Sequence, residues 1–303
     1  MKKQKIEITK EYVFAVCKKC NLIPITVQRF LIGQGNYVFR VTAENGTYVV
    51  RCANQSYRKT VRLLKRLAKL AINVPVPLRF GKYEGNHFMI CTYIDGADLG
   101  KVYHTLSDSD KRAIAKDVIA MQRRVSELQV KCQQAWIGQV RALLHRAKER
   151  ISVNGYFDAQ KVDALERLIP YFQSYLSNVH SVAYLDDIST KNLLIDNKRV
   201  SGVIDIDWLG CGDPLTFIAL TYMALLDMQY DTDYVKYLLA EMNTSESEYK
   251  AFLFYTLVYC VDFMGERGMT FCGKTVDVNT EIVNKLNRIY ENLFTELQSL
   301  LEA

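Results

Sequence analysis

A short β-hairpin within an otherwise helical region is the feature that most constrains how this chain folds. Residues 192–195 and 200–204 read as strands on either side of the turn Asp196-Asn-Lys198, whereas the flanking sequence has helical periodicity. Asparagine and aspartate favour tight turns because their side chains bond to nearby backbone. A hairpin of this size brings the end of its second strand back beside the loop that precedes its first strand.

Three polar side chains flank this hairpin. Asp187 and Asn192 precede the first strand, and Asp205 ends the second. Carboxylate and amide oxygens are the ligands that Mg²⁺ prefers, and phosphoryl transfer requires an oriented hydroxyl and a metal that neutralises phosphate oxygens. The spacing therefore predicts a site in which Asp187 accepts or orients a hydroxyl proton while Asn192 and Asp205 bind Mg²⁺. The alternative is that each residue only forms a turn or caps an element.

The first third of the chain has a mixed α/β pattern. Residues 36–43 alternate apolar and polar positions, and after a turn at 44–46 the chain returns as a second strand at 47–51. A helix follows, with four residues expected on its buried face: Val61, Leu64, Leu67 and Ala68. Another strand is expected at 87–91, shortly before the end of this region.

The rest of the chain is mostly helical. Helical patterns cover roughly 107–128 and 161–177, and several more occupy 215–301. The whole pattern predicts an α+β, bilobal fold. Residues 1–95 are expected to form a small N-terminal nucleotide-binding lobe with an antiparallel sheet and one main helix. Residues 96–303 are expected to form a larger helical lobe with the catalytic loop, the metal site and the acceptor site.

Composition excludes several classes of protein. No apolar segment follows the basic N-terminus, and no run approaches 18 uninterrupted apolar residues, so we expect a soluble, cytoplasmic protein. The eight cysteines are too dilute for a disulfide scaffold. Cys17 and Cys20 have C-x-x-C spacing, but no second pair completes a zinc site, and we expect both to be reduced.

Charge is distributed unevenly along the chain, whose net charge is +6. Residues 51–69 include seven basic side chains and no acid, whereas 212–249 include seven acids against one lysine. The first run indicates a face suited to phosphates and the second a face suited to a cation, although both are also compatible with solvated surface. A basic amphipathic helix at 58–69 for membranes or nucleic acid is a rival interpretation, but the helix is short and the flanking strands favour a packed lobe.

Two stretches resemble a known family. Tyr184-Leu-Asp-Asp-Ile-Ser-Thr-Lys-Asn-Leu-Leu-Ile-Asp196 is similar to the catalytic loop H-G-D-x-x-x-x-N-x-L-x-D of the aminoglycoside phosphotransferase and choline kinase superfamily. Gly202-Val-Ile-Asp-Ile-Asp-Trp208, followed by Gly212-Asp-Pro214, resembles its metal-binding segment. The resemblance extends from about residue 30 to 220. It implies a fold like that of protein kinases, with Asp187 as the catalytic base.

The resemblance also implies a nucleotide site for ATP or GTP. Arg51 matches the position of a basic residue that contacts the α- and β-phosphates, a role that a guanidinium can fill. The remaining positions that match nucleotide-binding positions are Gly33, Gly35 and Asn36 in a loop over the phosphates, and Thr92 and Ile94 in a hinge that meets the purine.

Four positions depart from the family pattern. Leu185 replaces a histidine that braces the catalytic loop, and Asp186 replaces a glycine. Thr60 stands where a helix glutamate usually pairs with the phosphate-binding cation, and no other acid occurs nearby in the sequence. Phe217 follows Gly-Asp-Pro where an acid is common. These changes bear on catalytic efficiency, while the expected base and metal ligands are all present.

The acceptor is expected in the helical lobe, where acids of the family often receive cationic substrates. The candidate residues are Asp227, Asp231, Asp262 and Glu266. The resemblance implies a Mg²⁺-dependent kinase that phosphorylates a hydroxyl of a small cationic molecule, such as an aminoglycoside-like or other antibiotic, in resistance or in ordinary metabolism. Choline, ethanolamine or a sugar is the alternative acceptor. A catalytically impaired nucleotide-binding scaffold is an alternative of another class. We expect a monomer or homodimer that binds neither nucleic acid nor membranes.

Overall fold

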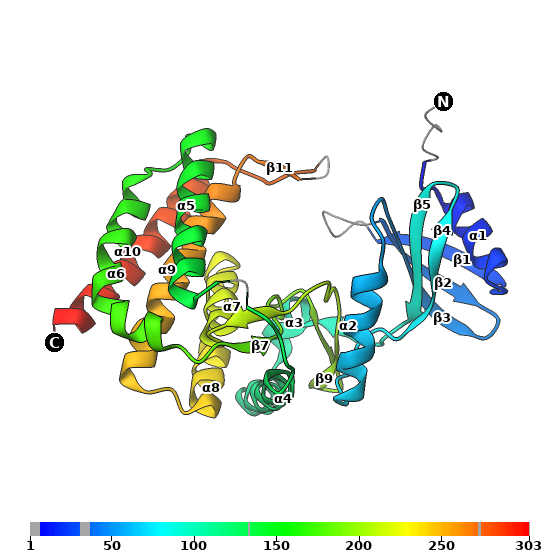
Figure 1. Cartoon of the computed structure of the whole chain (residues 1–303), viewed down its shortest axis with the longest axis horizontal. Coiled ribbons are helices and arrows are strands. Elements are labelled where there is room, and N and C mark those ends of the chain that lie inside the picture. Colours follow the sequence, from blue (N-terminus) through cyan, green and yellow to red (C-terminus); the bar gives the residue numbers. More distant parts are fainter. Residues whose placement is uncertain (1–6, 31–36, 133, 272–273, 303) are drawn as a thin grey trace. The chain divides into compact units, whose positions relative to one another are not determined.

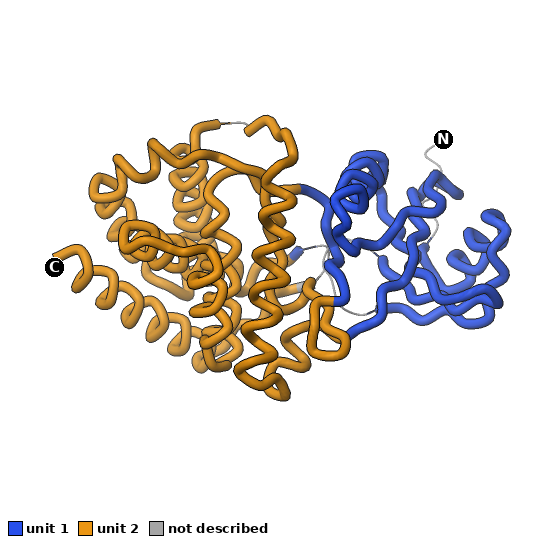
Figure 2. Tube along the Cα trace, turned by 90° about the horizontal axis from the view of Figure 1, so that it is seen from below, with its two compact units in different colours: residues 1–96, 201–208, 271–274 blue, residues 97–200, 209–270, 275–303 orange. Residues whose placement is uncertain are grey.

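The chain forms two compact units (Figure 2). The structure is a computed structural model that describes residues 7–30, 37–132, 134–271 and 274–302. The first unit comprises residues 1–96, 201–208 and 271–274, and the second comprises residues 97–200, 209–270 and 275–303. Each unit is described by itself below.

The first unit contains a five-stranded antiparallel sheet of order β1-β2-β3-β5-β4. Its strands are β1 (Pro24–Phe30), β2 (Tyr37–Ala43), β3 (Gly46–Ala53), β4 (Pro77–Tyr83) and β5 (Asn86–Thr92). The hairpin expected near 36–51 is β2 and β3, which pair from Ala43 with Gly46 to Tyr37 with Cys52. Gly46 has φ 137°, a conformation that glycine adopts without steric penalty.

Two helices accompany this sheet, α1 (Lys10–Lys19) and α2 (Arg58–Lys69). The apolar side of α1, including Val13 and Val16, joins the sheet residues Val41 and Val50 in one buried cluster. In α2 the buried residues are Thr60, Val61, Leu64 and Leu67. The expectation for Ala68 was wrong, because Ala68 is exposed and the polar Thr60 lies on the buried side instead.

The second unit is mostly helical (Figure 1). Its main helices are α4 (Asp108–Ser126), α5 (Trp136–Asn154), α6 (Gln160–Asn178), α7 (Leu215–Asp227), α8 (Asp233–Met242), α9 (Glu246–Glu266) and α10 (Thr280–Glu302). Its short elements are β6 (Ala97–Asp98), α3 (Leu99–Val102), the 3₁₀ helix η1 (Tyr103–Thr105), β7 (Val182–Tyr184), β8 (Leu193–Asp196) and β10 (Gly210–Gly212). Helix α9 packs against α5, α6, α7 and α10 and is buried on most sides. The α+β class expected from the sequence is confirmed.

The interior hairpin consists of β8 and β9 (Arg199–Val203), and the boundary between the units falls within β9. Asn197 and Lys198, with φ 46° and 64°, are both left-handed. Two successive left-handed residues are typical of the tight turns that join antiparallel strands. The pairing of β6 with β8, in which Ala97 lies opposite Ile195, continues this sheet.

A second ribbon supports the start of the loop at 185–192. Strand β7, which precedes the loop, pairs antiparallel with β10. Glycine is required at both ends of β10, because a Cβ on Gly210 would lie 2.3 Å from the Tyr184 ring and one on Gly212 would lie 2.1 Å from the Trp136 ring. Two aromatic rings thus lie directly on the backbone of β10.

The structure also bears on what the cysteine content and the hydropathy of the sequence led us to expect. Cys132 and Cys211, separated by 79 positions, form a disulfide that no sequence pattern predicted. Cys17 and Cys20 are free, as expected. No helix of the described residues is long and apolar enough to cross a membrane.

Candidate functional site

The loop 185–192, where the sequence predicts the catalytic residue, joins β7 to β8 and holds Asp187 by its backbone. The Asn192 Nδ2 donates a hydrogen bond of 2.9 Å to the Asp187 carbonyl, and the Ser189 hydroxyl donates one of 3.0 Å to Asp187 Oδ1. Asn192 and Ser189 are buried, whereas Asp187 is exposed. The loop therefore presents the Asp187 carboxylate from a fixed backbone, and Asn192 keeps its amide oxygen for another partner.

Gln122 braces this loop from helix α4. Its Nε2 donates to the Leu185 carbonyl and its Oε1 accepts from the Leu185 N–H, both at 2.9 Å. All of these groups are buried, so the carboxamide satisfies two backbone groups that water does not reach. Leu185 replaces the histidine of the family pattern, and the structure supplies a brace from Gln122 instead. A polar glutamine four residues after Val118, on the apolar face of a helix, was the sequence signal for this brace. Sequence reasoning missed it.

Tyr259 of helix α9 lies close to the same loop. Burial raises the pKa of its phenol well above the usual value, and the carboxylates of Asp186 and Asp187 raise it further. A phenol in this environment stays protonated and can donate a hydrogen bond. Asp186 is only partly buried and, like Asp187, carries a carboxylate at the loop. This part of the second unit therefore concentrates negative charge beside a hydrogen-bond donor.

In the first unit, Arg51 is the centre of a cation–carboxylate cluster. Its Nη2 donates to Asp205 Oδ1 at 3.0 Å and to Asp207 Oδ2 at 2.8 Å. Thr60 in α2 donates its hydroxyl to Asp207 Oδ1 at 3.1 Å. Burial opposes the charge of Arg51, but the two carboxylates outweigh it and raise its pKa. Asp207 therefore pairs with the cation where the family helix would supply a glutamate, and sequence reasoning did not single it out.

Asp205 combines an unusual backbone with an accessible carboxylate. Its φ of 59° is left-handed, which is uncommon for a residue other than glycine and is found most often at functional sites. The Asp205 side chain is 55% exposed, whereas Arg51 is buried. The Nε of Arg51 is also buried and has no hydrogen-bond partner within the described residues. An anion at this cluster would meet an unsatisfied guanidinium donor as well as the cation's charge.

The hinge residues Thr92 and Ile94 follow the sheet of the first unit. Thr92 ends β5, and its N–H donates to the Val76 carbonyl at 3.1 Å while its Oγ1 accepts from the Val76 N–H at 2.9 Å. Within the described residues, the backbone N–H and C=O of Ile94 have no hydrogen bond. The backbone groups of Ile94 are therefore available for a hydrogen bond to a purine. The N–H of Thr92 is already bonded to Val76. The predicted phosphate-loop residues Gly33, Gly35 and Asn36 lie outside the described residues.

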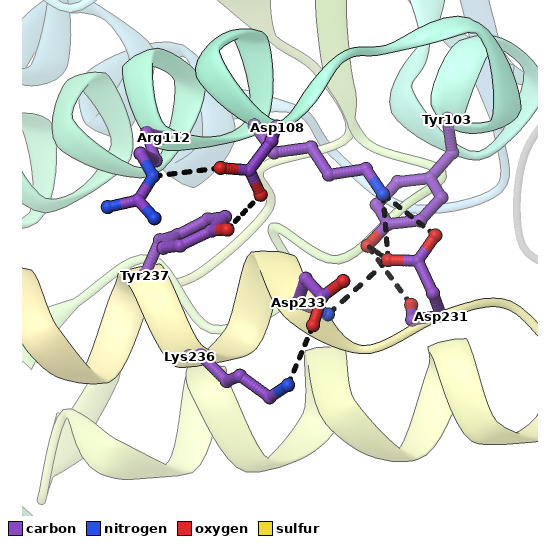
Figure 3. Close-up of polar contacts among 8 residues, drawn as sticks. Tyr103, Asp108, Arg112, Asp231, Asp233, Lys236 and Tyr237 are labelled. Carbon is purple, nitrogen blue, oxygen red and sulfur yellow. Dashed lines mark hydrogen bonds and ion pairs between the residues drawn. The ribbon is translucent and has the colours of Figure 1, made fainter.

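Among the predicted acceptor residues, Asp231 is bound by groups of helix α4 and η1 (Figure 3). The Lys111 Nζ donates to both carboxylate oxygens at 2.7 Å, and the Tyr103 hydroxyl donates to Oδ1 at 3.1 Å. Burial acts to raise the pKa of Asp231, but the bonds from Lys111 and Tyr103 outweigh it and lower the pKa. The carboxylate of Asp231 is thus already paired with a cation of this chain.

Asp227 has a similar environment. Arg267 Nη2 lies 3.0 Å from its Oδ2, and Lys285 Nζ lies 2.8 Å from its Oδ1. All three side chains are mostly buried, so these are not freely solvated surface pairs. The two cations, from residues far along the chain, hold Asp227 at the end of α7.

Asp262 and Glu266 share their cations on the α5–α9 face. Arg150 contacts Asp262 at 3.1 Å and Glu266 at 3.4 Å, and Arg146 contacts Asp262 at 3.3 Å. Burial and the charge of Asp262 raise the pKa of Glu266. All four predicted acceptor acids are therefore ion-paired within the second unit.

A buried aspartate follows directly after β10. Asp213 is 4% exposed and accepts hydrogen bonds from the hydroxyls of Tyr175 and Tyr255, at 2.8 and 2.9 Å, and from the Leu215 N–H at 3.0 Å. Trp136 in turn donates to the Tyr255 hydroxyl at 2.7 Å. Burial raises the pKa of Asp213, although the three donors oppose the shift. The network fixes the segment directly after β10, and so helps to hold β7.

Oxygen ligands of the kind that Mg²⁺ prefers occur in each unit. No group of three or more histidine, cysteine, aspartate or glutamate residues able to hold a metal exists in the part of the chain that the structure describes. Mg²⁺ in nucleotide enzymes is usually bound by only one or two protein oxygens together with the phosphates. The free amide oxygen of Asn192 and the exposed carboxylate of Asp205 are hard oxygen ligands of this kind.

Comparison with known proteins agrees with this fold. An α+β chain with a five-stranded sheet, a helical unit and a loop of this design has the fold of a small-molecule kinase. Residues 26–252 match the model of the phosphotransferase enzyme family. The chain therefore belongs to the phosphotransferase enzyme family, as the sequence resemblance indicated. No curated protein matches it significantly.

Solved structures of aminoglycoside phosphotransferases have a similar fold. The ADP-bound APH(2″)-Ib is 15% identical, with a TM-score of 0.64 over 94% of this chain and 97% of that one. The gentamicin complex of APH(2″)-IIa is 15% identical, with a TM-score of 0.63 over 98% of this chain and 96% of that one. A thermostable mutant of APH(4)-Ia in ternary complex with ADP and hygromycin B is 12% identical, with a TM-score of 0.64 over 97% of this chain and 98% of that one.

Proposed function

We propose that this protein transfers the γ-phosphoryl group of ATP or GTP to a hydroxyl of a small cationic molecule, such as an aminoglycoside or other antibiotic. The observation that carries the proposal is the catalytic loop, in which Asn192 and Ser189 fix the backbone and side chain of an exposed Asp187. Membership of the phosphotransferase family gives this loop its chemical context. Similar structures are complexes with ATP or ADP and with aminoglycosides, which supports the same classes of ligand here.

In this mechanism the protein groups orient the acceptor hydroxyl, bind the nucleotide and bind the metal. Asp187 accepts or orients the proton of the acceptor hydroxyl as its oxygen approaches phosphorus. Arg51 binds the α- and β-phosphates, and the backbone of Ile94 binds the purine, with Thr92 beside it. Asn192 and Asp205 hold Mg²⁺, which neutralises negative charge on the phosphate oxygens when it is bound.

Arg51 has to redistribute its hydrogen bonds when phosphates arrive. In the present structure its Nη2 is shared between Asp205 and Asp207. Because Asp207 is also held by Thr60, we propose that Asp207 remains the partner of Arg51 while Asp205 turns to the metal. The unpaired Nε of Arg51 supports this assignment, since it offers an additional donor to an oxyanion.

The preference for a cationic acceptor rests on the loop itself. Asp186 and Asp187 place two adjacent carboxylates there, and opposite charge attracts a cationic substrate to such a position. Asp227, Asp231, Asp262 and Glu266 remain proposed acceptor residues on the sequence resemblance. Each would have to exchange a cation of this chain for one of the acceptor, as their ion pairs indicate.

Two alternatives keep specific support. Choline, ethanolamine or a sugar as acceptor is compatible with the same base and metal ligands. A catalytically impaired nucleotide-binding scaffold is motivated by Leu185 and Thr60, although Gln122 and Asp207 replace the contacts that these substitutions remove. The reaction requires a nucleoside triphosphate, so we propose a cytoplasmic location, with the enzyme acting as a monomer or homodimer.

Product detection tests the proposal. The purified protein is incubated with ATP or GTP, Mg²⁺ and a panel of aminoglycosides, macrolides, choline, ethanolamine and sugars, and phosphorylated products are identified by mass. We expect a product with an amino-bearing acceptor, its formation lost without Mg²⁺ and reduced by a factor of about 10²–10⁴ in Asp187→Asn. Nucleotide binding without turnover on any acceptor would favour the scaffold alternative.

A further inference from the structure

The outer face of α2 carries a row of basic side chains that no acid in the described part of the chain neutralises. Arg58, Arg62, Lys65 and Lys69 follow one another at intervals of four, three and four residues, which places them on one helix face. All four are exposed, and their side chains have no hydrogen bond or ion pair among the described residues. Like charges at these intervals repel one another and weaken a helix. An anionic ligand would remove this repulsion.

A hollow of about 370 Å³ lies beside this row in the first unit. Arg58, Val61, Arg62 and Lys65 of α2 line it, together with Phe80 of β4. No acid is among the lining residues that the structure describes. The Phe80 side chain is 46% exposed, so an aromatic ring is available in the same place as three cations. The volume falls in the range of small-molecule sites, about 300–1,000 Å³.

This hollow is separate from the Arg51 cluster. Thr60, which bonds to Asp207, is two residues from both Arg58 and Arg62. Two residues correspond to roughly 200° around an α-helix, so Thr60 lies on nearly the opposite face. Thr60 is buried and the two arginines are exposed, in agreement with this geometry. The nucleotide residues of the proposed function do not account for the outer face of α2.

We propose that this hollow binds a small organic anion in which a phosphate, or a chemically similar group, is attached to a flat apolar ring. The guanidinium groups of Arg58 and Arg62 match the geometry of a phosphate, and Lys65 adds a further charge. The exposed face of Phe80 is suited to stacking with a ring. The size of the hollow favours a small molecule over a nucleic acid or a membrane surface, which need no hollow of this kind. The site goes beyond the phosphoryl transfer proposed above and does not depend on it.

Binding of 1-naphthyl phosphate to the full chain tests this site without measuring catalysis. The naphthyl fluorescence anisotropy is titrated with wild-type protein, with Arg62→Gln, and with the matched control Lys59→Gln. Both substitutions remove one exposed charge from α2, but only Arg62 lines the hollow. We expect Arg62→Gln to weaken binding by about fivefold or more and Lys59→Gln by less than about twofold. Phe80→Ala is expected to weaken binding by about threefold through loss of ring contact.

Several results would overturn the proposal. One is equal affinity in Arg62→Gln and Lys59→Gln, and another is no saturable binding to the wild-type protein. Equal binding of neutral 1-naphthalenemethanol would show that the cations do not take part. Retention on vesicles of anionic phospholipid, or on RNA, that is lost in Arg62→Gln while 1-naphthyl phosphate does not bind would identify the face as a macromolecular interface instead. Circular dichroism of each variant verifies that the fold is retained.

Discussion

The brace between Gln122 and Leu185 makes a strong prediction about the catalytic loop. Gln122→Met keeps the length of the side chain and its apolar contacts, but it removes both hydrogen bonds of 2.9 Å. Each bond contributes about 1 kcal/mol, and each buried backbone group left without a partner costs about 1–3 kcal/mol. Some relaxation of the loop will recover part of this, so we expect the free energy of unfolding to fall by about 2–4 kcal/mol.

Two measurements separate this effect from general destabilisation. Urea unfolding gives the change in stability, and hydrogen exchange of the Leu185 amide reports the hydrogen bond directly. Gln173→Met is the matched control, because Gln173 is exposed on α6 and, among the described residues, its side chain bonds only to Ser177. It should change stability by no more than about 0.5 kcal/mol. If Gln122→Met is equally harmless and the Leu185 amide stays protected, the reasoning about the brace is refuted.

Three further substitutions test other parts of the structure. Cys132→Ser opens a disulfide that spans 79 positions and should lower the free energy of unfolding by about 2–4 kcal/mol in non-reducing buffer, with no further loss on adding dithiothreitol. Thr60→Val removes the bond to Asp207 and should cost about 1 kcal/mol in urea unfolding; an unchanged stability would contradict it. Burial raises the pKa of Asp213, so the folded state binds its proton more tightly than the unfolded state. The stability of wild type relative to Asp213→Asn should therefore fall as the pH rises above about 4, and a pH-independent difference would contradict the raised pKa.

The sequence predicted the parts of the fold that depend on local pattern. The hairpins and long helices have alternation or helical periodicity within one segment, and short turns fix their ends. Ala68 shows the limit of this approach, because one small residue at the edge of an apolar stripe does not determine where burial ends. The buried Thr60 on the same helix bonds to Asp207, far along the chain, and the local pattern does not show this contact.

The candidate site was predicted where a motif carries it and missed where distant residues meet. Asp187 and Asn192 are five positions apart in a recognisable loop, and their hydrogen bond follows from that loop. The pairing of Arg51 with Asp207 joins positions 156 residues apart, and no local pattern specifies it. The same applies to Asp227 and Asp231 of the acid-rich region 212–249, which pair with cations far away in the sequence. A run of like charge in a sequence therefore does not establish an open binding surface.

The most direct test of the proposed mechanism is a crystal structure with Mg²⁺ and a non-hydrolysable ATP analogue. We predict that the amide oxygen of Asn192 and a carboxylate oxygen of Asp205 lie about 2.0–2.1 Å from the same metal ion, with Asp187 facing the γ-phosphate. A bound nucleotide whose metal is coordinated by neither side chain, with positions 187, 192 and 205 pointing to separate regions, would contradict the mechanism.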